Sequence, residues 1–140
     1  SAASDVYKRQ PLIRAKETAQ IFLSARNIPI IYDDRIMEMC FGTYEGIENS
    51  FEIPDFPINV LFKDPVNYIP VENGESFEQL FARTGEFLEQ AVRPQLEDGK
   101  DVLIVGHGAM NSSIVCQIKN EPLENFWKAG IKNCKLMKLI

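Results

Sequence analysis

The chain has 140 residues, enough for one domain, and its 45% apolar and 25% charged residues are proportions typical of a globular protein. A formal charge of −5 without a basic stripe argues against nucleic acid as a partner. The three cysteines are too far apart for a metal site or a secreted disulfide framework, and no apolar run approaches the roughly 20 residues of a membrane helix. We therefore expect a cytoplasmic protein with no membrane partner.

Residues 1–10 do not match the sequence that follows them. Asp5 to Gln10 resemble the translation of a transposon-end adapter used in sequencing libraries. We interpret 1–10 as a non-native leader, the alternative being a natural disordered start, and place the beginning of the domain at Pro11.

The first half of the domain alternates a regular element with an irregular segment. Apolar spacing after Pro11 predicts a helix that ends near Asn27, and the β-branched run at 28–32 predicts a strand. Residues 33–46 read as a loop. Residues 48–72 are rich in proline but too apolar for a disordered linker, so they are interpreted as a cap insertion.

The second half reads more regularly. Ser76 and Gln79 form a capping-box pattern that starts a long helix, and Pro94 marks its predicted end. The run Asp101–Val105 predicts a buried strand, Ala109–Ile118 and Leu123–Trp127 predict helices, and Cys134–Ile140 predicts a final strand. This alternation favours an α/β layered domain.

The single histidine, His107, is the strongest candidate for chemistry. It follows the predicted strand, lies between Gly106 and Gly108, and precedes a helix. Ligands bind at the carboxyl ends of strands in α/β sheets, and anions are favoured at helix N-termini. Glycines on either side would let an anion approach the backbone. A structural histidine in a turn is the alternative.

Two further residues are candidates, each with a plain structural alternative. Arg14 lies near a helix start, where a guanidinium can bind phosphate through two hydrogen bonds, although it can equally be a surface arginine. Glu38 lies beside Met37 and Met39, and apolar neighbours favour the protonated form that a general acid needs. It is also one of 20 acidic residues. Arg83 is interpreted as a structural ion-pair partner.

Other catalytic signatures are absent from the sequence. It contains no Gly-x-Ser-x-Gly, no P-loop, no Gly-x-Gly-x-x-Gly and no cluster of metal ligands. We therefore expect no metal and no cofactor.

Four segments together resemble the histidine phosphatase family, which includes phosphoglycerate mutases. They occur in the family's order: PLIRAKETA, RIMEMCFGTYEG with Tyr44 at a tryptophan position, ENGESFEQLFART, and VLIVGHGAMN. The resemblance implies a three-layer α/β/α sandwich and hydrolysis of a small phosphorylated substrate through a phosphohistidine. It also implies that Arg14, His107 and Gly108 bind the phosphate and that Glu38 protonates the leaving oxygen.

The sequence departs from the family at one decisive place. The family begins with a strand and Arg-His-Gly, whose histidine is the nucleophile, and no such segment is present here. We therefore expect a partial domain over 11–140, missing its first strand, that is inactive by itself although its parent is a phosphatase. A non-catalytic phosphate-binding or interaction module remains an alternative, as does a mutase, which the short insertion disfavours. The missing glycine-rich loop also disfavours a nucleotide-binding domain. The cap's Phe51, Phe56, Phe62 and Tyr68 either pack or select an apolar or aromatic phosphoester.

Overall fold

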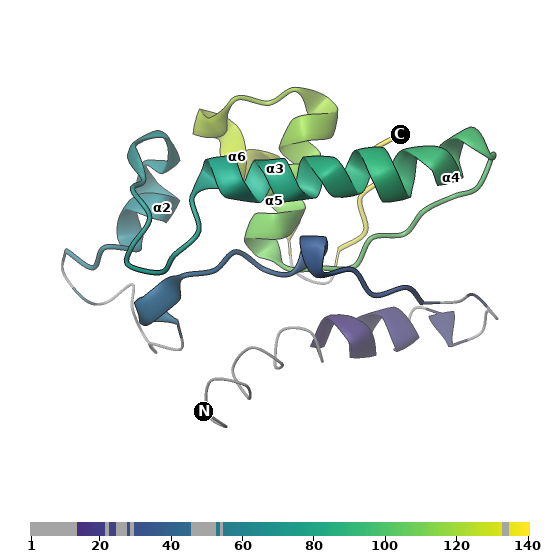
Figure 1. Cartoon of the computed structure of the whole chain (residues 1–140), viewed down its shortest axis with the longest axis horizontal. Coiled ribbons are helices and arrows are strands. Elements are labelled where there is room, and N and C mark those ends of the chain that lie inside the picture. The colour runs from purple at the N-terminus through teal and green to yellow at the C-terminus, as the bar shows by residue number, and fades with distance from the viewer. Residues whose placement is uncertain are drawn as a thin grey trace.

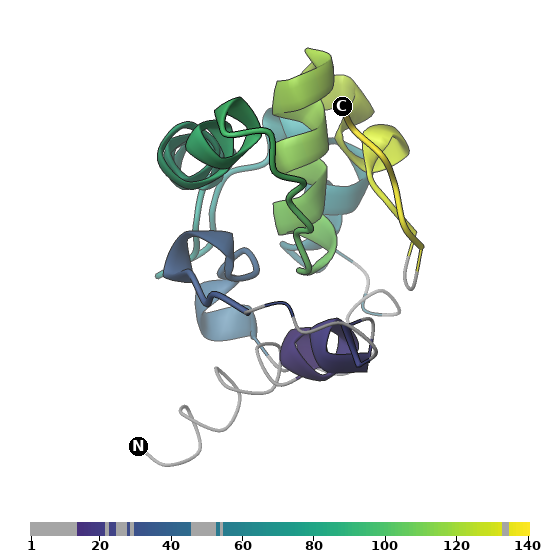
Figure 2. The same cartoon turned by 90° about the vertical axis from the view of Figure 1, so that its right-hand side faces the viewer.

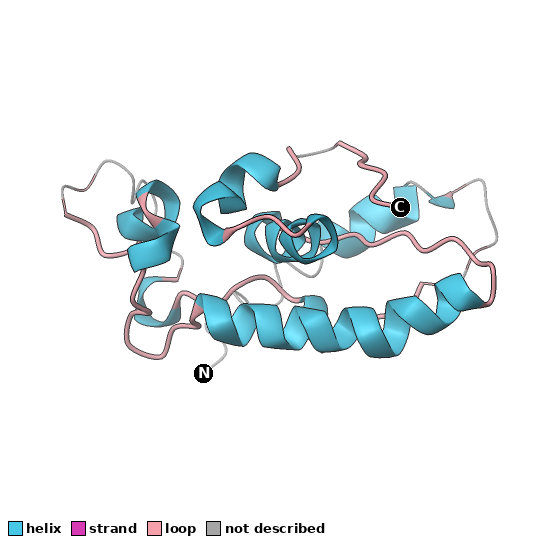
Figure 3. Cartoon of the chain, turned by 90° about the horizontal axis from the view of Figure 1, so that it is seen from above, coloured by secondary structure: helices cyan, strands magenta, loops and turns pink. Residues whose placement is uncertain are grey.

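The computed structural model describes residues 14–21, 23–24, 28, 30–45, 53, 55–132 and 135–140. Two crossing helical bodies form its centre (Figure 1). One is a continuous helix made of α3 (Phe77–Phe87), the π-helical turn η5 (Leu88–Val92) and α4 (Arg93–Glu97). The other is α5 (Gly108–Lys119), which packs against α3. Figure 3 shows the long helix from the side and α5 nearly along its axis, so the two cross steeply.

The remaining helical elements are short. Residues 14–21 are helical, in agreement with the expected first helix, and the 3₁₀ turns η1 (Asp34–Ile36) and η2 (Gly42–Tyr44) lie in the segment that follows. The described part of the cap contains α2 (Asn59–Lys63) and η4 (Pro65–Asn67). After α5 come η6 (Leu123–Asn125) and α6 (Phe126–Ala129), where a short helical piece was expected.

The start of the long helix is as predicted, but its predicted end is wrong. The Ser76 side chain accepts from the Gln79 N–H at 3.1 Å, and the Gln79 side chain accepts from the Ser76 N–H at 2.9 Å. Pro94 does not stop the helix, which continues to Glu97. A proline has no N–H and its ring crowds the carbonyl four residues before it. The wider π-helical turn immediately before α4 changes the hydrogen-bond register there, which accommodates the ring.

The core has two parts, joined by a polar bridge between α3 and α5. The larger part is largely aromatic and lies between α3, α6 and the cap, and the smaller part includes Phe87, Met110 and Ile114. Thr84 and Ser113 are fully buried and share a hydrogen bond of 3.0 Å, and Gln117 donates to the Thr84 hydroxyl at 2.8 Å. Because buried hydroxyls are costly without partners, this bridge fixes the register of the two helices.

The three predicted strands are not observed among the described residues, so the predicted sheet stays a prediction. Residues 28 and 30–32, 101–105 and 135–140 belong to no β-ladder. Ile31 is 83% exposed, Leu103 46% and Leu136 70%. Residues 101–106 form no backbone hydrogen bond with another described residue. An apolar run shows that a segment suits a sheet, but a strand exists only when a neighbour pairs with its backbone. Within the described chain the only β-type pairing is the bridge Phe41–Gly74.

Candidate functional site

The carboxylate of Glu38 lies on the N-terminus of α5. Its oxygens accept from the N–H of Ala109 at 3.2 Å and of Met110 at 2.9 Å, across about 70 residues of sequence, and from its own neighbour Met39 at 2.9 Å. The first N–H groups of a helix have no partner within the helix and carry partial positive charge, so a carboxylate is favoured there. Two of the segments singled out in the sequence are thus in direct contact.

A partly buried ion pair holds the segment that carries Glu38. The guanidinium of Arg83, from α3, binds both oxygens of Glu75, with Nε–Oε1 2.6 Å and Nη2–Oε2 3.0 Å. It also donates to the carbonyl oxygen of Arg35 at 2.6 Å and to that of Glu38 at 3.3 Å. Glu75 in turn accepts from the N–H of Cys40 at 3.1 Å. Arg83 is therefore the structural ion-pair partner that the sequence suggested, and its two backbone contacts bracket the turn that presents Glu38.

His107 and Gly108 lie at the N-terminus of α5, next to the N–H groups that Glu38 binds. His107 is the N-cap residue of α5, is half-buried, and its imidazole does not cap the helix. Gly108 is exposed, and no described residue accepts a hydrogen bond from its N–H. A Cβ on Gly108 would lie 3.9 Å from Glu38 Oε2, which shows how near the two are. The structure thus brings together His107, Gly108 and Glu38.

Arg14 is on the same side of the molecule but not in contact with this group. The helical residues 14–21 lie beyond the N-terminal end of α5 in two perpendicular views (Figures 1 and 2). The Arg14 side chain is exposed, and its guanidinium makes no hydrogen bond or ion pair with a residue that the structure describes. Its assignment to the phosphate remains a prediction.

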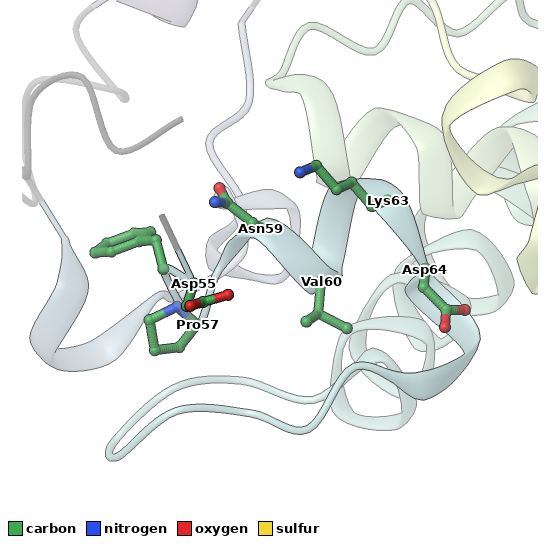
Figure 4. A pocket seen from close by; sticks show the side chains of 7 residues that line it. Asp55, Pro57, Asn59, Val60, Lys63 and Asp64 are labelled. Atoms are coloured by element: carbon green, nitrogen blue, oxygen red, sulfur yellow. The ribbon is translucent and has the colours of Figure 1, made fainter. Parts of the chain in front are cut away.

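A shallow hollow of about 370 Å³ lies elsewhere, over the cap helix α2. It is lined by Asp55, Phe56, Pro57, Asn59, Val60, Lys63 and Asp64 (Figure 4). In the close view Asn59 and Lys63 lie on one side of the ribbon and Val60 on the other, with Asp55 and Asp64 at opposite ends. Because these polar groups do not converge and none of Arg14, Glu38 and His107 lines the hollow, we do not assign it chemistry.

Neither described thiol is an activated nucleophile. Burial raises the pKa of Cys116, and the nearby charge of Glu121 raises it further. Burial likewise raises the pKa of Cys40, partly offset by a backbone hydrogen bond. A reactive thiol needs the opposite shift. No group of three potential metal ligands occurs among the described residues, and none of the described helices has the length and apolar character to span a membrane.

Comparison with known proteins identifies the family. The histidine phosphatase superfamily (branch 1) matches residues 10–140, and the chain therefore belongs to this superfamily. The family resemblance inferred from the sequence is thereby confirmed.

Individual relatives include both phosphatases and mutases. The chain is 28% identical over 138 residues to a putative phosphoserine phosphatase 2 of Hydrogenobacter thermophilus, covering 96% of this chain and 66% of that protein. It is 30% identical over 107 residues to a 2,3-bisphosphoglycerate-dependent phosphoglycerate mutase of Cytophaga hutchinsonii, covering 74% and 50%. The crystal structure of the alpha-ribazole phosphatase from Shigella flexneri superimposes with a TM-score of 0.65 at 25% identity, over 85% of this chain and 58% of that one.

These comparisons support an α/β fold of the phosphoglycerate-mutase type. The chain spans about two thirds or less of the length of the relatives it matches. Sequence reasoning missed one residue beside the site, Trp127, whose ring edge lies near Gly108. It occurs in a four-residue helix, where the sequence carries too short a pattern to show which way a side chain points.

Proposed function

We propose that the parent protein of this chain hydrolyses small phosphomonoesters through a phosphohistidine intermediate. The observation that carries the proposal is the contact between Glu38 and the start of α5. It places a carboxyl group, the Gly108 N–H and the His107 backbone at one point, although Glu38 and the helix are far apart in sequence. Membership of the histidine phosphatase superfamily supports the same reaction.

Each residue has a role in this proposal. Arg14 and the Gly108 N–H bind phosphate oxygens, and His107 donates a hydrogen bond to the transferring group. The P–O bond of the ester breaks as a bond to a nucleophilic histidine forms, and Glu38 gives its proton to the leaving oxygen. Water then displaces the histidine, and the phosphate leaves. Positioned donors that stabilise developing charge supply most of the acceleration in phosphoryl transfer.

The observed position of Glu38 adds a requirement. Its carboxylate accepts three backbone hydrogen bonds, so it lies there as an acceptor and not as a donor. The general-acid role therefore requires the Glu38 side chain to release the helix N–H groups and turn toward the ester. The freed N–H groups of Ala109 and Met110 would then be available to phosphate.

The sequence contains one histidine, so it cannot supply both a nucleophile and the hydrogen-bonding histidine. We expect the 140-residue chain to show no turnover of para-nitrophenyl phosphate and no phosphohistidine. Acid-labile phosphate on the protein would contradict this expectation. If a longer product of the same gene contains Arg-His-Gly, we expect it to turn the ester over.

The roles are tested in that longer product. Glu38→Gln should lower kcat by about 10²–10⁴, the usual contribution of a general acid. His107→Ala should lower kcat strongly as well. Glu97→Gln, on the exposed end of α4, is the control and should have no effect. Full activity of both site variants would refute the assigned roles.

Two other functions remain for the same fold. If the longer product binds phosphate without turnover, it is a phosphate-binding or interaction module. The mutase relatives make phosphoglycerate isomerisation the second alternative. The small cap favours hydrolysis.

We retain the three-layer sandwich, with 28–32, 101–105 and 134–140 as strands, and the cytoplasmic location as parts of this proposal.

A further inference from the structure

A stacked pair of aromatic side chains stands beside the candidate site. Phe62, from α2, and Trp127, from α6, have ring centroids 4.9 Å apart and planes inclined by 26°. The indole N–H of Trp127 donates to the carbonyl oxygen of Leu61 at 2.7 Å, which fixes the orientation of its ring. Phe126 contacts the same indole edge-to-face at 4.8 Å. We call Phe62 and Trp127 the aromatic wall.

The wall reaches the start of α5. A Cβ on Gly108 would lie 4.0 Å from Cζ3 of Trp127 and 3.9 Å from Oε2 of Glu38. The six-membered ring of the indole is therefore directed at the residue whose N–H is assigned to the phosphate, with Glu38 on another side. Gly108 itself is exposed to solvent, so a ligand can reach its backbone.

The other aromatic side chains of the cap do not compete for this position. Phe56 and Tyr68 are 7% and 8% exposed and belong to the core, where they pack edge-to-face against Tyr44 and Phe77. Phe51 lies outside the described residues. Phe62 and Trp127, in contrast, remain partly exposed. The sequence left open whether cap aromatics pack or select a substrate, and burial assigns Phe56 and Tyr68 to packing.

We infer that the aromatic wall selects phosphomonoesters whose leaving group is an aromatic ring. The inference depends on the proposed function, because it places the phosphate at Gly108. An ester oxygen between Gly108 and Glu38 would direct its substituent toward Cζ3 of Trp127. Aromatic rings gain from offset or edge-to-face contact beyond the area they bury. The wall also offers a polar substituent no hydrogen bond, because Leu61 already takes the indole N–H. Leaving groups such as serine or glycerate would be desolvated there without compensation.

The test uses the 140-residue chain and needs no turnover. Trp127 is the only tryptophan, so its fluorescence reports binding at the wall, and calorimetry gives the affinity independently. Inorganic phosphate, methylphosphonate and phenylphosphonate are titrated in turn. The two phosphonates differ only in the ring. We expect phenylphosphonate to bind about tenfold more tightly than methylphosphonate, the factor that one good ring contact provides.

Variants separate the wall from the phosphate site. Trp127→Leu keeps an apolar side chain and, followed by calorimetry, should reduce the phenyl-to-methyl affinity ratio toward one, with methylphosphonate affinity unchanged. Val60→Ala, an exposed position on α2, is the control and should keep the ratio. If the variant fails to fold, the ratio of phenylphosphonate to methylphosphonate affinity on the unmodified chain still tests the inference.

The outcomes distinguish this inference from the proposed function. Equal affinity for the two phosphonates, with measurable phosphate binding, would overturn the wall as a selector and leave the phosphate site intact. Binding of none of the three ligands would overturn the phosphate site and the inference together. A tenfold preference that survives Trp127→Leu would overturn the aromatic wall as its source.

Discussion

Replacing Arg83 by methionine should destabilise the chain far more than removing an arginine from the exposed side of the same helix. Methionine keeps the aliphatic stem but loses all four hydrogen bonds of the guanidinium, two to Glu75 and two to the carbonyls of Arg35 and Glu38. The Glu75 side chain is only 12% exposed, so its carboxylate would remain largely buried without its cation.

The size of the effect follows from this burial. Removing one partner of a buried ion pair costs about 3–5 kcal/mol, because the other charge is left uncompensated. Arg83 is 23% exposed, and Glu75 keeps the bond from the Cys40 N–H, so water and backbone replace part of the loss. We therefore expect a decrease of about 2–4 kcal/mol in the free energy of unfolding. Arg83→Lys keeps the positive charge but not the planar guanidinium that binds both oxygens of Glu75. We therefore expect its loss of stability to be smaller than that of Arg83→Met.

Urea unfolding followed by circular dichroism measures this change. With a slope of about 2 kcal/mol per molar urea, the midpoint should fall by about 1–2 M. The control is Arg93→Met, which removes an ion pair with Glu89 whose side chains are 62% and 60% exposed. Exposed pairs of this spacing contribute only about 0.3–0.5 kcal/mol. Equal shifts for the two variants would refute the reasoning that burial, and not the mere presence of an ion pair, sets the loss.

Three further predictions concern the scaffold. Gly42→Ala should lower stability by about 2 kcal/mol or more, because Gly42 has a φ of +57° and a Cβ would meet the backbone of Glu72; unchanged thermal unfolding would contradict this. Ser76→Ala removes one half of the capping box and should cost about 1 kcal/mol in urea unfolding, with Ser76→Asp as the variant that restores it. Because burial raises the pKa of both Cys40 and Cys116, alkylation by iodoacetamide should be slow at neutral pH and accelerate as pH rises. Cys116 should react more slowly than Cys40 in the native chain and at the same rate in urea; fast native labelling of Cys116 would show that its helix opens.

Local sequence patterns gave the helices that begin with strong signals. The Ser76–Gln79 pair specifies a helix start through bonds between near neighbours, and both bonds are present. The same holds for α5, which begins one residue from the predicted position. The end at Pro94 was mispredicted because a π-helical turn, which depends on the packing of the whole helix, accommodates the ring.

Strands could not be settled in the same way. The run at 101–105 is apolar enough for a sheet, yet its backbone pairs with no described residue. Strand formation depends on a partner that is remote in sequence, and an apolar run contains no information about that partner. Whether the expected sheet forms therefore depends on backbone hydrogen bonding between strands and not on the composition of each run.

The sequence by itself determined which chemical groups this protein has and which family it belongs to. One histidine between two glycines and a glutamate before Phe-Gly are one-dimensional patterns, and the superfamily match confirms their family. Only the tertiary structure decided what these groups touch. It placed the Glu38 carboxylate on the N–H groups of α5, and it brought Trp127 to the edge of Gly108. The physical reason is that such contacts join segments far apart in the chain, and the crossing of packed helices sets their distances while local propensity does not.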